Sequence, residues 1–255
     1  MLNLDLRNRT AIVTGATGQL GRVIAATLAN CGADVILCYK QNEEKAKELA
    51  KNIAQTEGVR TFIACADVGS FESVQTMGKK IAGEFKMPDI VCDCAVEQYK
   101  WTTVLEQNIE DYEGQFRSCV LHNVNMAKIF IPNMINNKYG RFIGINTECS
   151  MQNHPNQSAY VSGKRGMDGV FRVLAREVGA NGITVNQVAP GWTISDNDRK
   201  NHTERSPEYE SHVALSRRGT DQEIANVVAF VASDLSSFIT GAYIPVCGGY
   251  IMPSI

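Results

Sequence analysis

Tyr160 and Lys164, two residues that can take part in proton transfer, stand four positions apart in a segment whose apolar residues recur at helical spacing. Side chains four apart share one face of a helix. A phenol has a pKa of about 10, and a nearby ammonium group stabilises the phenolate and lowers that pKa. We therefore expect Tyr160 to exchange a proton with an alcohol or ketone, with Lys164 lowering the pKa of its phenol.

A hydroxyl group is expected close to this pair. Thr147 follows the strand-like run 140–145 and precedes Tyr160 by thirteen positions. In a parallel sheet, a residue at that point emerges at the carboxyl edge of the sheet, where ligands bind. Thr147, Tyr160 and Lys164 are therefore candidates for one catalytic site.

Three glycines near the N-terminus form a second candidate site. Gly15, Gly18 and Gly21 lie between the apolar run 11–13 and a segment of helical composition. Glycine permits a tight turn and close backbone approach, and the free N–H groups of a helix N-terminus attract phosphate. We expect this strand-to-helix junction to bind the pyrophosphate of a nucleotide.

The elements that position these residues alternate regularly along the chain. Strands are predicted near 10–14, 34–39, 60–66, 89–95, 140–146, 183–188 and 242–247. Helices are predicted near 20–31, 42–56, 70–85, 110–136, 158–179 and 221–233. This alternation predicts a single α/β domain over 1–255, with a doubly wound parallel sheet of about seven strands and helices on both faces. The polar stretch 192–218 carries no strand, and we expect it to be a lid over a substrate pocket.

Composition excludes several classes of partner. The chain has 255 residues, 44% apolar and 20% charged, with a net charge of −2, so it has no basic field that would attract nucleic acid or an anionic membrane. No stretch approaches the length of a membrane span, and the start lacks the apolar core of a signal peptide. We expect a cytoplasmic protein.

Metal and disulfide chemistry are not expected. The eight cysteines are irregularly spaced, without a C-x-x-C motif or a matched pair of histidines. The histidines are unclustered and are expected at the surface or in the lid; they are His122, His154, His202 and His212.

The order of these motifs resembles that of the short-chain dehydrogenase/reductase family, especially its ketoacyl-carrier-protein reductase-like members. The likeness runs from Leu4 to Gly249 and includes the glycine loop, Thr147, the Tyr160 and Lys164 motif, Pro190-Gly191 and the C-terminal stretch 236–249. It implies a Rossmann fold and an NAD(P)-dependent oxidoreductase that moves hydride between nicotinamide and a carbonyl or secondary alcohol.

The resemblance also implies residue roles. Tyr160 would be the general acid/base, Lys164 would lower its pKa and bind the nicotinamide ribose, and Thr147 would replace the usual serine that orients the substrate oxygen. The implied cofactor-binding residues, with Asp67 at the adenine, are Gly15, Thr17, Gly18, Gln19, Leu20, Gly21, Lys40, Asp67, Val68, Ala95, Tyr160, Lys164, Pro190, Gly191 and Thr193.

Four residues depart from the family pattern. Gln19 stands where shorter members have the middle glycine, Val96 replaces a glycine, and Cys247 replaces an aspartate. Cys119 occupies the place of a catalytic asparagine, so the proton relay would be weakened, because a thiol is a weak hydrogen-bonding group. These departures keep open a nucleotide-binding module without turnover. The glycine spacing also suggests a redox-neutral epimerase. The short C-terminal region argues against this alternative.

The cofactor is predicted from the end of the second strand. The sequence Tyr39-Lys40-Gln41-Asn42 has no acid before Glu43 that would bind the ribose hydroxyls of NAD. Lys40 can pair with the 2′-phosphate, which favours NADP. NAD remains the alternative if Lys40 only contacts solvent.

The substrate is expected to be small to medium and polar. Polar candidates beside Thr147 and in the predicted lid are Glu148, Gln152, Asn153, His154, Asp196, Asn197, Asp198, Arg199, Lys200, His202 and Arg205. Apolar anchors are Trp101, Trp192 and Tyr250. The family resemblance also implies a homotetramer or homodimer formed through 111–136, 158–179 and 242–246.

Overall fold

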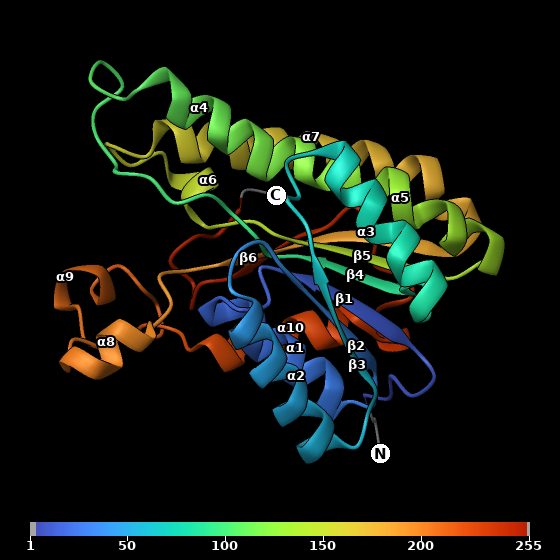
Figure 1. The fold of residues 1–255 in the computed structure, drawn as a ribbon. Coiled ribbons are helices and arrows are strands. Elements are labelled where there is room, and N and C mark those ends of the chain that lie inside the picture. Colours follow the sequence, from blue (N-terminus) through green and yellow to red (C-terminus); the bar gives the residue numbers. More distant parts are fainter. Residues whose placement is uncertain (1–3, 254–255) are drawn as a thin grey trace.

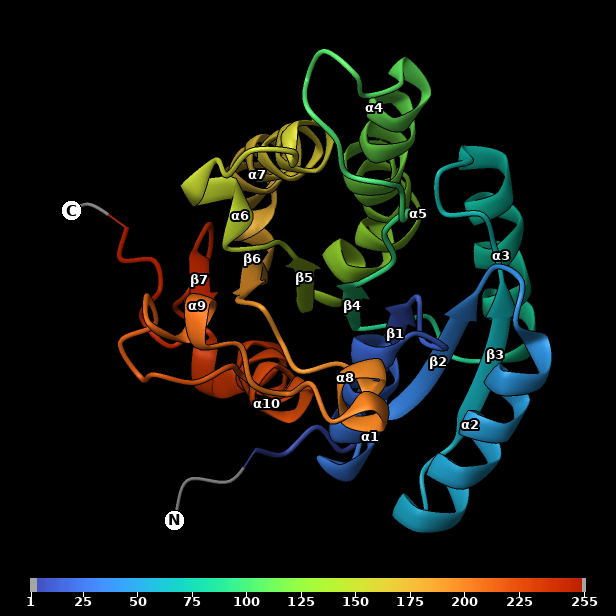
Figure 2. The same cartoon turned by 90° about the vertical axis from the view of Figure 1, so that its left-hand side faces the viewer.

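A parallel sheet forms the centre of the protein, whose computed structural model describes residues 4–253 (Figure 1). In this part of the chain the sheet has seven strands in the order β3-β2-β1-β4-β5-β6-β7, seen side by side in Figure 2. Their bounds are β1 Thr10–Thr14, β2 Asp34–Tyr39, β3 Thr61–Cys65, β4 Ile90–Asp93, β5 Gly140–Ile145, β6 Ile183–Pro190 and β7 Tyr243–Val246. The predicted doubly wound Rossmann fold is confirmed.

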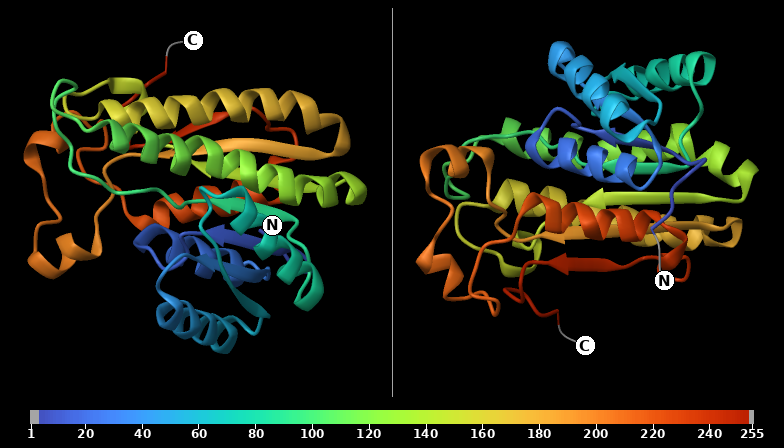
Figure 3. Two further views of the ribbon diagram at one scale, coloured as in Figure 1. Left: turned by 45° about the horizontal axis from the view of Figure 1, so that its top comes forward. Right: turned by 90° about the horizontal axis from the view of Figure 1, so that it is seen from below.

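Helices cover both faces of the sheet (Figure 3). One face packs against α1 Gln19–Asn30, α2 Glu43–Glu57 and α10 Asp221–Ala232, and the other against α3 Phe71–Glu84, α5 His122–Asn137 and α7 Ser158–Val178. Alternate residues of β1 show the division, because Ala11 and Val13 belong to the first core and Ile12 to the second. A strand buried on both faces is apolar throughout, which explains the continuous apolar runs of the sequence.

The long helix predicted over 110–136 is interrupted. It comprises α4 Ile109–Gln115, the π-helical turn η1 Phe116–Leu121 and α5. Within it, Asn123 Nδ2 donates a 2.5 Å hydrogen bond to the carbonyl of Cys119. A π-helical turn adds a residue to the helix without changing its apolar periodicity enough to be seen in the sequence.

Short elements complete the described chain. Those not yet named are α6 Cys149–Gln152, α8 Asp196–Asn201, α9 Pro207–Glu210 and the 3₁₀ turns η2 Gly179–Asn181 and η3 Asp234–Ser236. The α8 and α9 helices lie away from the helical layers, at one end of the sheet (Figure 1). No helix within the described residues is long and apolar enough to cross a membrane.

The sequence predicts His122 at the surface or in the lid, and this prediction is wrong. His122 is 1% exposed, and its Nε2 lies 3.2 Å from Oδ1 of Asp93, which ends β4 in the core. Its Nδ1 lies 3.1 Å from the carbonyl oxygen of Ser118. Burial raises the pKa of Asp93, and His122 lowers it in part. A carboxyl partner inside the core allows an imidazole to be buried there, and sequence spacing does not reveal that partner.

The buried Asp93–His122 pair provides a test of core stability. His122→Ala should lower the free energy of unfolding by about 3 kcal/mol, because it leaves a buried carboxyl group without its partner. Urea unfolding measures this change, with exposed His212→Ala as the matched control. Adding Asp93→Asn should recover part of the loss, and a His122→Ala variant as stable as the control would contradict the assignment.

Candidate active site

The glycine loop is shaped by close backbone contacts. Gly15 has φ +63°, and a Cβ atom at this position would lie 3.0 Å from Cα of Ala95. A Cβ atom at Gly21 would lie 2.2 Å from the carbonyl oxygen of Gly15. The loop therefore requires glycine at both positions, and it places the N-terminus of α1 beside the carboxyl end of β4. This geometry fits the pyrophosphate of a dinucleotide.

A large cavity of about 1040 Å³ extends from this loop along the carboxyl ends of the strands. All but one of the predicted cofactor-binding residues line it; they are Gly15, Thr17, Gly18, Gln19, Leu20, Gly21, Lys40, Asp67, Val68, Ala95, Tyr160, Lys164, Pro190 and Gly191. The exception, Thr193, lines a smaller adjoining cavity. We call these two spaces the large cavity and the small cavity.

Charged side chains meet at the far end of the large cavity. Lys40 Nζ lies 2.8 Å from Oδ2 of Asp67, and this hydrogen bond holds the pKa of Asp67 below its usual value. Arg117 of η1 also lines the cavity and lowers the pKa of Asp67 further. Sequence reasoning missed Arg117, because only the packing of η1 brings it beside the ends of β2 and β3.

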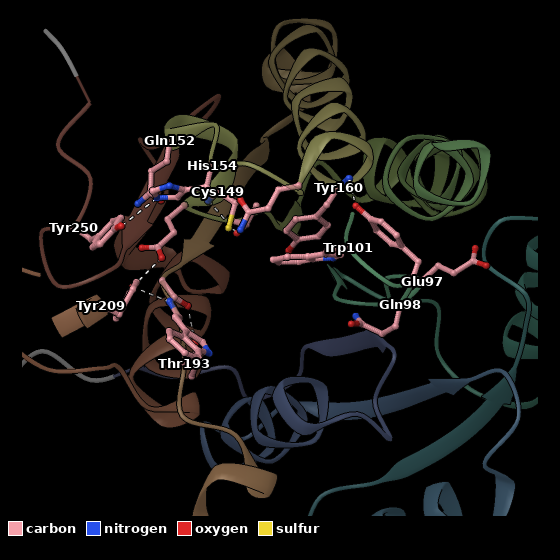
Figure 4. A pocket seen from close by; sticks show the side chains of 16 residues that line it. Glu97, Gln98, Trp101, Cys149, Gln152, His154, Tyr160, Thr193, Tyr209 and Tyr250 are labelled. Carbon is pink, nitrogen blue, oxygen red and sulfur yellow. Dashed lines mark hydrogen bonds between the residues drawn. The ribbon is translucent and has the colours of Figure 1, made fainter. Parts of the chain in front are cut away.

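Thr147 and Tyr160 stand where the two cavities meet. Both line the large cavity and also the small one, which has a volume of about 440 Å³. In Figure 4 the ring of Tyr160 faces Trp101, and their ring centroids are 5.7 Å apart. The backbone N–H of Tyr160 donates a 2.7 Å hydrogen bond to the hydroxyl of Tyr99, which fixes the start of α7.

The predicted effect of Lys164 on the pKa of Tyr160 is wrong for this structure. Burial raises the pKa of Tyr160, and the side chain of Thr147 is the group that lowers it in part. Lys164 is buried, and its Nζ donates a 2.5 Å hydrogen bond to the carbonyl of Ile145. Nζ lies 5.8 Å from the centroid of the Tyr160 ring, and the loss of solvent around the phenol outweighs the interactions that lower its pKa.

Cys119 lies behind the cavities rather than in them. Its side chain is 1% exposed and belongs to the core that packs against α3, α5 and α7. Its Sγ lies 3.8 Å from Oε1 of Gln115, at the distance of a weak hydrogen bond. Cys119 is not among the described residues that line either cavity, so the structure brings together Thr147, Tyr160 and Lys164 but not the thiol.

The small cavity has aromatic walls and an acidic group (Figure 4). Tyr209 and Tyr250 stack with their ring centroids 4.8 Å apart. The Tyr209 hydroxyl donates a 2.8 Å hydrogen bond to Oε1 of Glu148, whose pKa is raised to about 7 by burial. Tyr209 was not predicted as a site residue, because it is 61 positions from Glu148 in a stretch that has no motif.

The segment 192–218 is held to the glycine loop by side chains of α1. Gln19 Nε2 donates a 2.8 Å hydrogen bond to the carbonyl of Ile194, and Arg22 pairs with Asp196 at 2.7 Å. Gln19, which departs from the family pattern, thus contacts both the large cavity and this segment. The segment contributes Trp192, Thr193 and Tyr209 to the small cavity.

The polar residues of this segment that were predicted to contact the substrate do not line the cavities. Arg199 pairs with Asp221, Arg205 with Glu210, and Asp198 with Arg218. None of the seven residues proposed from this segment is among the described residues that line either cavity. The charges of Asp196, Asp198, Arg199 and Arg205 are neutralised by ion pairs, and the expectation that these residues line the substrate pocket is wrong.

The family is decided by comparison with known proteins. The model of a family described as enoyl-(acyl carrier protein) reductase matches residues 15–251. The chain belongs to the short-chain dehydrogenase/reductase family. A 3-oxoacyl-[acyl-carrier-protein] reductase of Staphylococcus epidermidis is 32% identical over 255 residues, covering 96% of this chain and all of that one. The corresponding enzyme of Rickettsia bellii is 32% identical, covering 98% and 99% of the two chains.

Solved structures of this family have the same architecture. L-sorbose reductase from Gluconobacter frateurii, complexed with NADPH and L-sorbose, is 22% identical with a TM-score of 0.91 over 99% of this chain and all of that one. A putative NAD(P)-dependent gluconate 5-dehydrogenase from Beutenbergia cavernae, with bound NADP, is 26% identical with a TM-score of 0.88, over 98% and 99% of the chains.

These comparisons confirm the prediction of an oxidoreductase of the short-chain dehydrogenase/reductase family. They give no support to a binding module that has lost turnover. The departures at Gln19 and Cys119 are accommodated by the packing described above, and neither displaces Thr147 or Tyr160 from the junction of the two cavities.

Proposed function

We propose that this family member transfers hydride at the junction of the two cavities, with Tyr160 as general acid/base and a small, polar carbonyl compound or secondary alcohol as substrate. The observation that carries this proposal is that Thr147 and Tyr160 line both cavities. A substrate in the small cavity can therefore contact both hydroxyls and a nicotinamide at the same point.

The chain's own residues supply the proton and the orientation. NADPH, when bound along the large cavity, supplies the hydride that the carbonyl carbon accepts. Thr147 donates a hydrogen bond to the substrate oxygen, and the Tyr160 hydroxyl gives its proton to that oxygen as the new alcohol forms. In the direction of oxidation, the phenolate of Tyr160 takes that proton back. Lys164, whose Nζ donates to the carbonyl of Ile145, would also hold the nicotinamide ribose.

We propose that Lys40 recognises the 2′-phosphate of NADP. Lys40 is 60% exposed at its side chain, and it already holds Asp67 at the end of the large cavity. A phosphate can join this pair and also meet the guanidinium of Arg117. The solved relatives with bound NADPH or NADP support the same preference.

Lys40→Asp should shift the preference from NADPH toward NADH by about tenfold or more, because a charge-assisted contact to phosphate contributes about 1.5 to 3 kcal/mol. Fluorescence titration of both cofactors measures the shift. Lys79→Asp makes the same change of charge on exposed α3, away from both cavities, and should leave the ratio unchanged. Equal affinities of the unaltered protein for NADPH and NADH would overturn the role of Lys40.

Tyr160→Phe should lower the rate of carbonyl reduction by about 10² to 10⁴, since a general acid contributes about this much. The affinity for NADPH and the melting temperature should hardly change, because the ring still packs against Trp101. Stopped-flow oxidation of NADPH and thermal melting measure these effects. A variant that keeps full turnover would remove Tyr160 from the mechanism.

The raised pKa of Tyr160 also fixes the sign of its pH dependence. The phenol donates its proton below its pKa, and this donor is lost as the pH rises through that pKa, so the rate of reduction at saturating substrate should hold from about pH 6 to about pH 9. The unaltered enzyme could instead lose activity within that range, while Tyr160→Phe does not. That result would show that Lys164 lowers the pKa of Tyr160 once the cofactor is bound.

We also propose a homodimer or homotetramer, located in the cytoplasm. Exposed apolar side chains support an interface on the layer of α4, η1 and α7, namely Phe116, Leu121 and Val173. A stable contact would bury about 1,000 Å² or more. Light scattering at micromolar concentration should give the mass of a dimer or tetramer, and Val173→Glu should lower it. A monomeric mass for the unaltered chain would overturn this proposal.

A further inference from the structure

Glu148 holds a buried carboxyl oxygen without a partner beside the proposed catalytic hydroxyls. We propose that Glu148 binds a hydroxyl group next to the reacting carbonyl, so that the substrate is a neutral polyhydroxylated ketone or aldehyde, or the corresponding alcohol. This inference rests on the proposed function and names the substrate class of the same site.

The backbone fixes Glu148 at the small cavity. It follows Thr147 directly, and its N–H donates a 2.9 Å hydrogen bond to the carbonyl of Pro190 at the end of β6. The residue is 3% exposed, although it lines the cavity. A carboxyl group in such a place costs free energy of desolvation, which must be offset by hydrogen bonds.

Only one of its two oxygens has such a bond. Oε1 accepts from the Tyr209 hydroxyl, and this hydroxyl accepts in turn from the N–H of Trp192 at 2.9 Å. Oε2 is buried and has no partner. It lies 2.8 Å from the position that a Cβ atom would take if Gly191 had a side chain, and Gly191 lines both cavities. The free oxygen therefore lies beside Gly191, in the wall that the two cavities share, and a substrate hydroxyl is proposed as its donor.

Two further polar atoms of the small cavity are buried and unpartnered. They are Nε2 of Gln152, a donor, and Oε1 of Gln157, an acceptor. Together with Oε2 of Glu148, they make two acceptors and one donor around a space walled by aromatic rings. Several hydroxyl groups can satisfy all three atoms, whereas an acyl chain would leave each of them without a hydrogen bond.

The charges of the small cavity disfavour an acidic substrate. Its lining includes Glu97 and Glu148 but no lysine or arginine among the described residues. A carboxylate or phosphate on the substrate would lose solvent beside Glu97 and Glu148, and the one basic side chain of the described lining, His154, has its Nε2 3.1 Å from the Tyr250 hydroxyl. Lys164 does not supply a cation there, because it lines the large cavity and donates to a backbone carbonyl. A neutral substrate meets no such penalty.

The test compares carbonyl classes with NADPH as the common cofactor. The panel holds neutral ketopentoses and ketohexoses, pyruvate as a 2-ketoacid, acetoacetyl-N-acetylcysteamine as an acyl thioester, and cyclohexanone as a ketone without hydroxyls. The unaltered enzyme should give its highest kcat/KM with a neutral ketose.

Glu148→Gln then tests the residue. It keeps the shape and the bond from Tyr209 to Oε1, but it replaces the free oxygen Oε2 by an NH2 group, which cannot accept a hydrogen bond from a substrate hydroxyl. KM for the ketose should rise by about tenfold or more, because a hydrogen bond to a carboxylate contributes at least about 1.4 kcal/mol. KM for cyclohexanone, NADPH affinity and melting temperature should stay unchanged. Exposed Glu177→Gln on α7 is the matched control.

The possible failures are distinguishable. If no carbonyl of the panel accepts hydride, the proposed function itself is wrong. Higher kcat/KM with pyruvate or the acyl thioester than with any neutral ketose would overturn only the substrate class. An equal rise of KM for ketose and cyclohexanone in Glu148→Gln would mean that Glu148 supports the cavity without binding a hydroxyl, which also overturns the inference.

Discussion

The contact between β1 and the turn after β4 sets the geometry of the whole site. Thr14 Oγ1 accepts hydrogen bonds from the N–H groups of Cys94 and Ala95, at 2.9 and 3.2 Å. The next residue, Gly15, packs against Ala95 without room for a side chain. Because the strand order reverses between β1 and β4, a crevice opens at this point, and the cofactor and substrate cavities both follow from it.

Burial, more than charge, determines the acid–base properties around this crevice. Loss of solvent raises the pKa of Tyr160, and it also raises the pKa of Glu148 to about 7. A phenol that keeps its proton suits the reduction of a carbonyl. A carboxyl group that titrates near neutrality can lose its proton once a hydroxyl donates to it, because that bond favours the charged form.

Periodicity was enough to predict the layers and the strands, whereas most of the residues that line the large cavity were named from the family resemblance. Apolar runs and glycine spacing are local, and the chain order of Thr147, Tyr160 and Lys164 follows from the parallel sheet. The contacts that sequence reasoning missed join distant residues: Asp93 with His122, and Tyr209 with Glu148. They depend on how the first residue of α5 and the short helix α9 pack, and neither contact leaves a periodic pattern in the sequence.

The two cavities differ in charge, and this difference separates their ligands. The large cavity has Lys40, Arg117 and Lys164 on its walls and the N-terminus of α1 at its glycine loop, all of which favour a phosphorylated cofactor. The small cavity has carboxyl groups and aromatic rings, with no lysine or arginine in the described residues. A phosphorylated cofactor would be stabilised in the large cavity and disfavoured in the small one, whereas a neutral, hydroxyl-rich substrate would meet no such penalty in the small cavity. Because Thr147 and Tyr160 line both cavities, the two ligands would then meet at the same pair of hydroxyls.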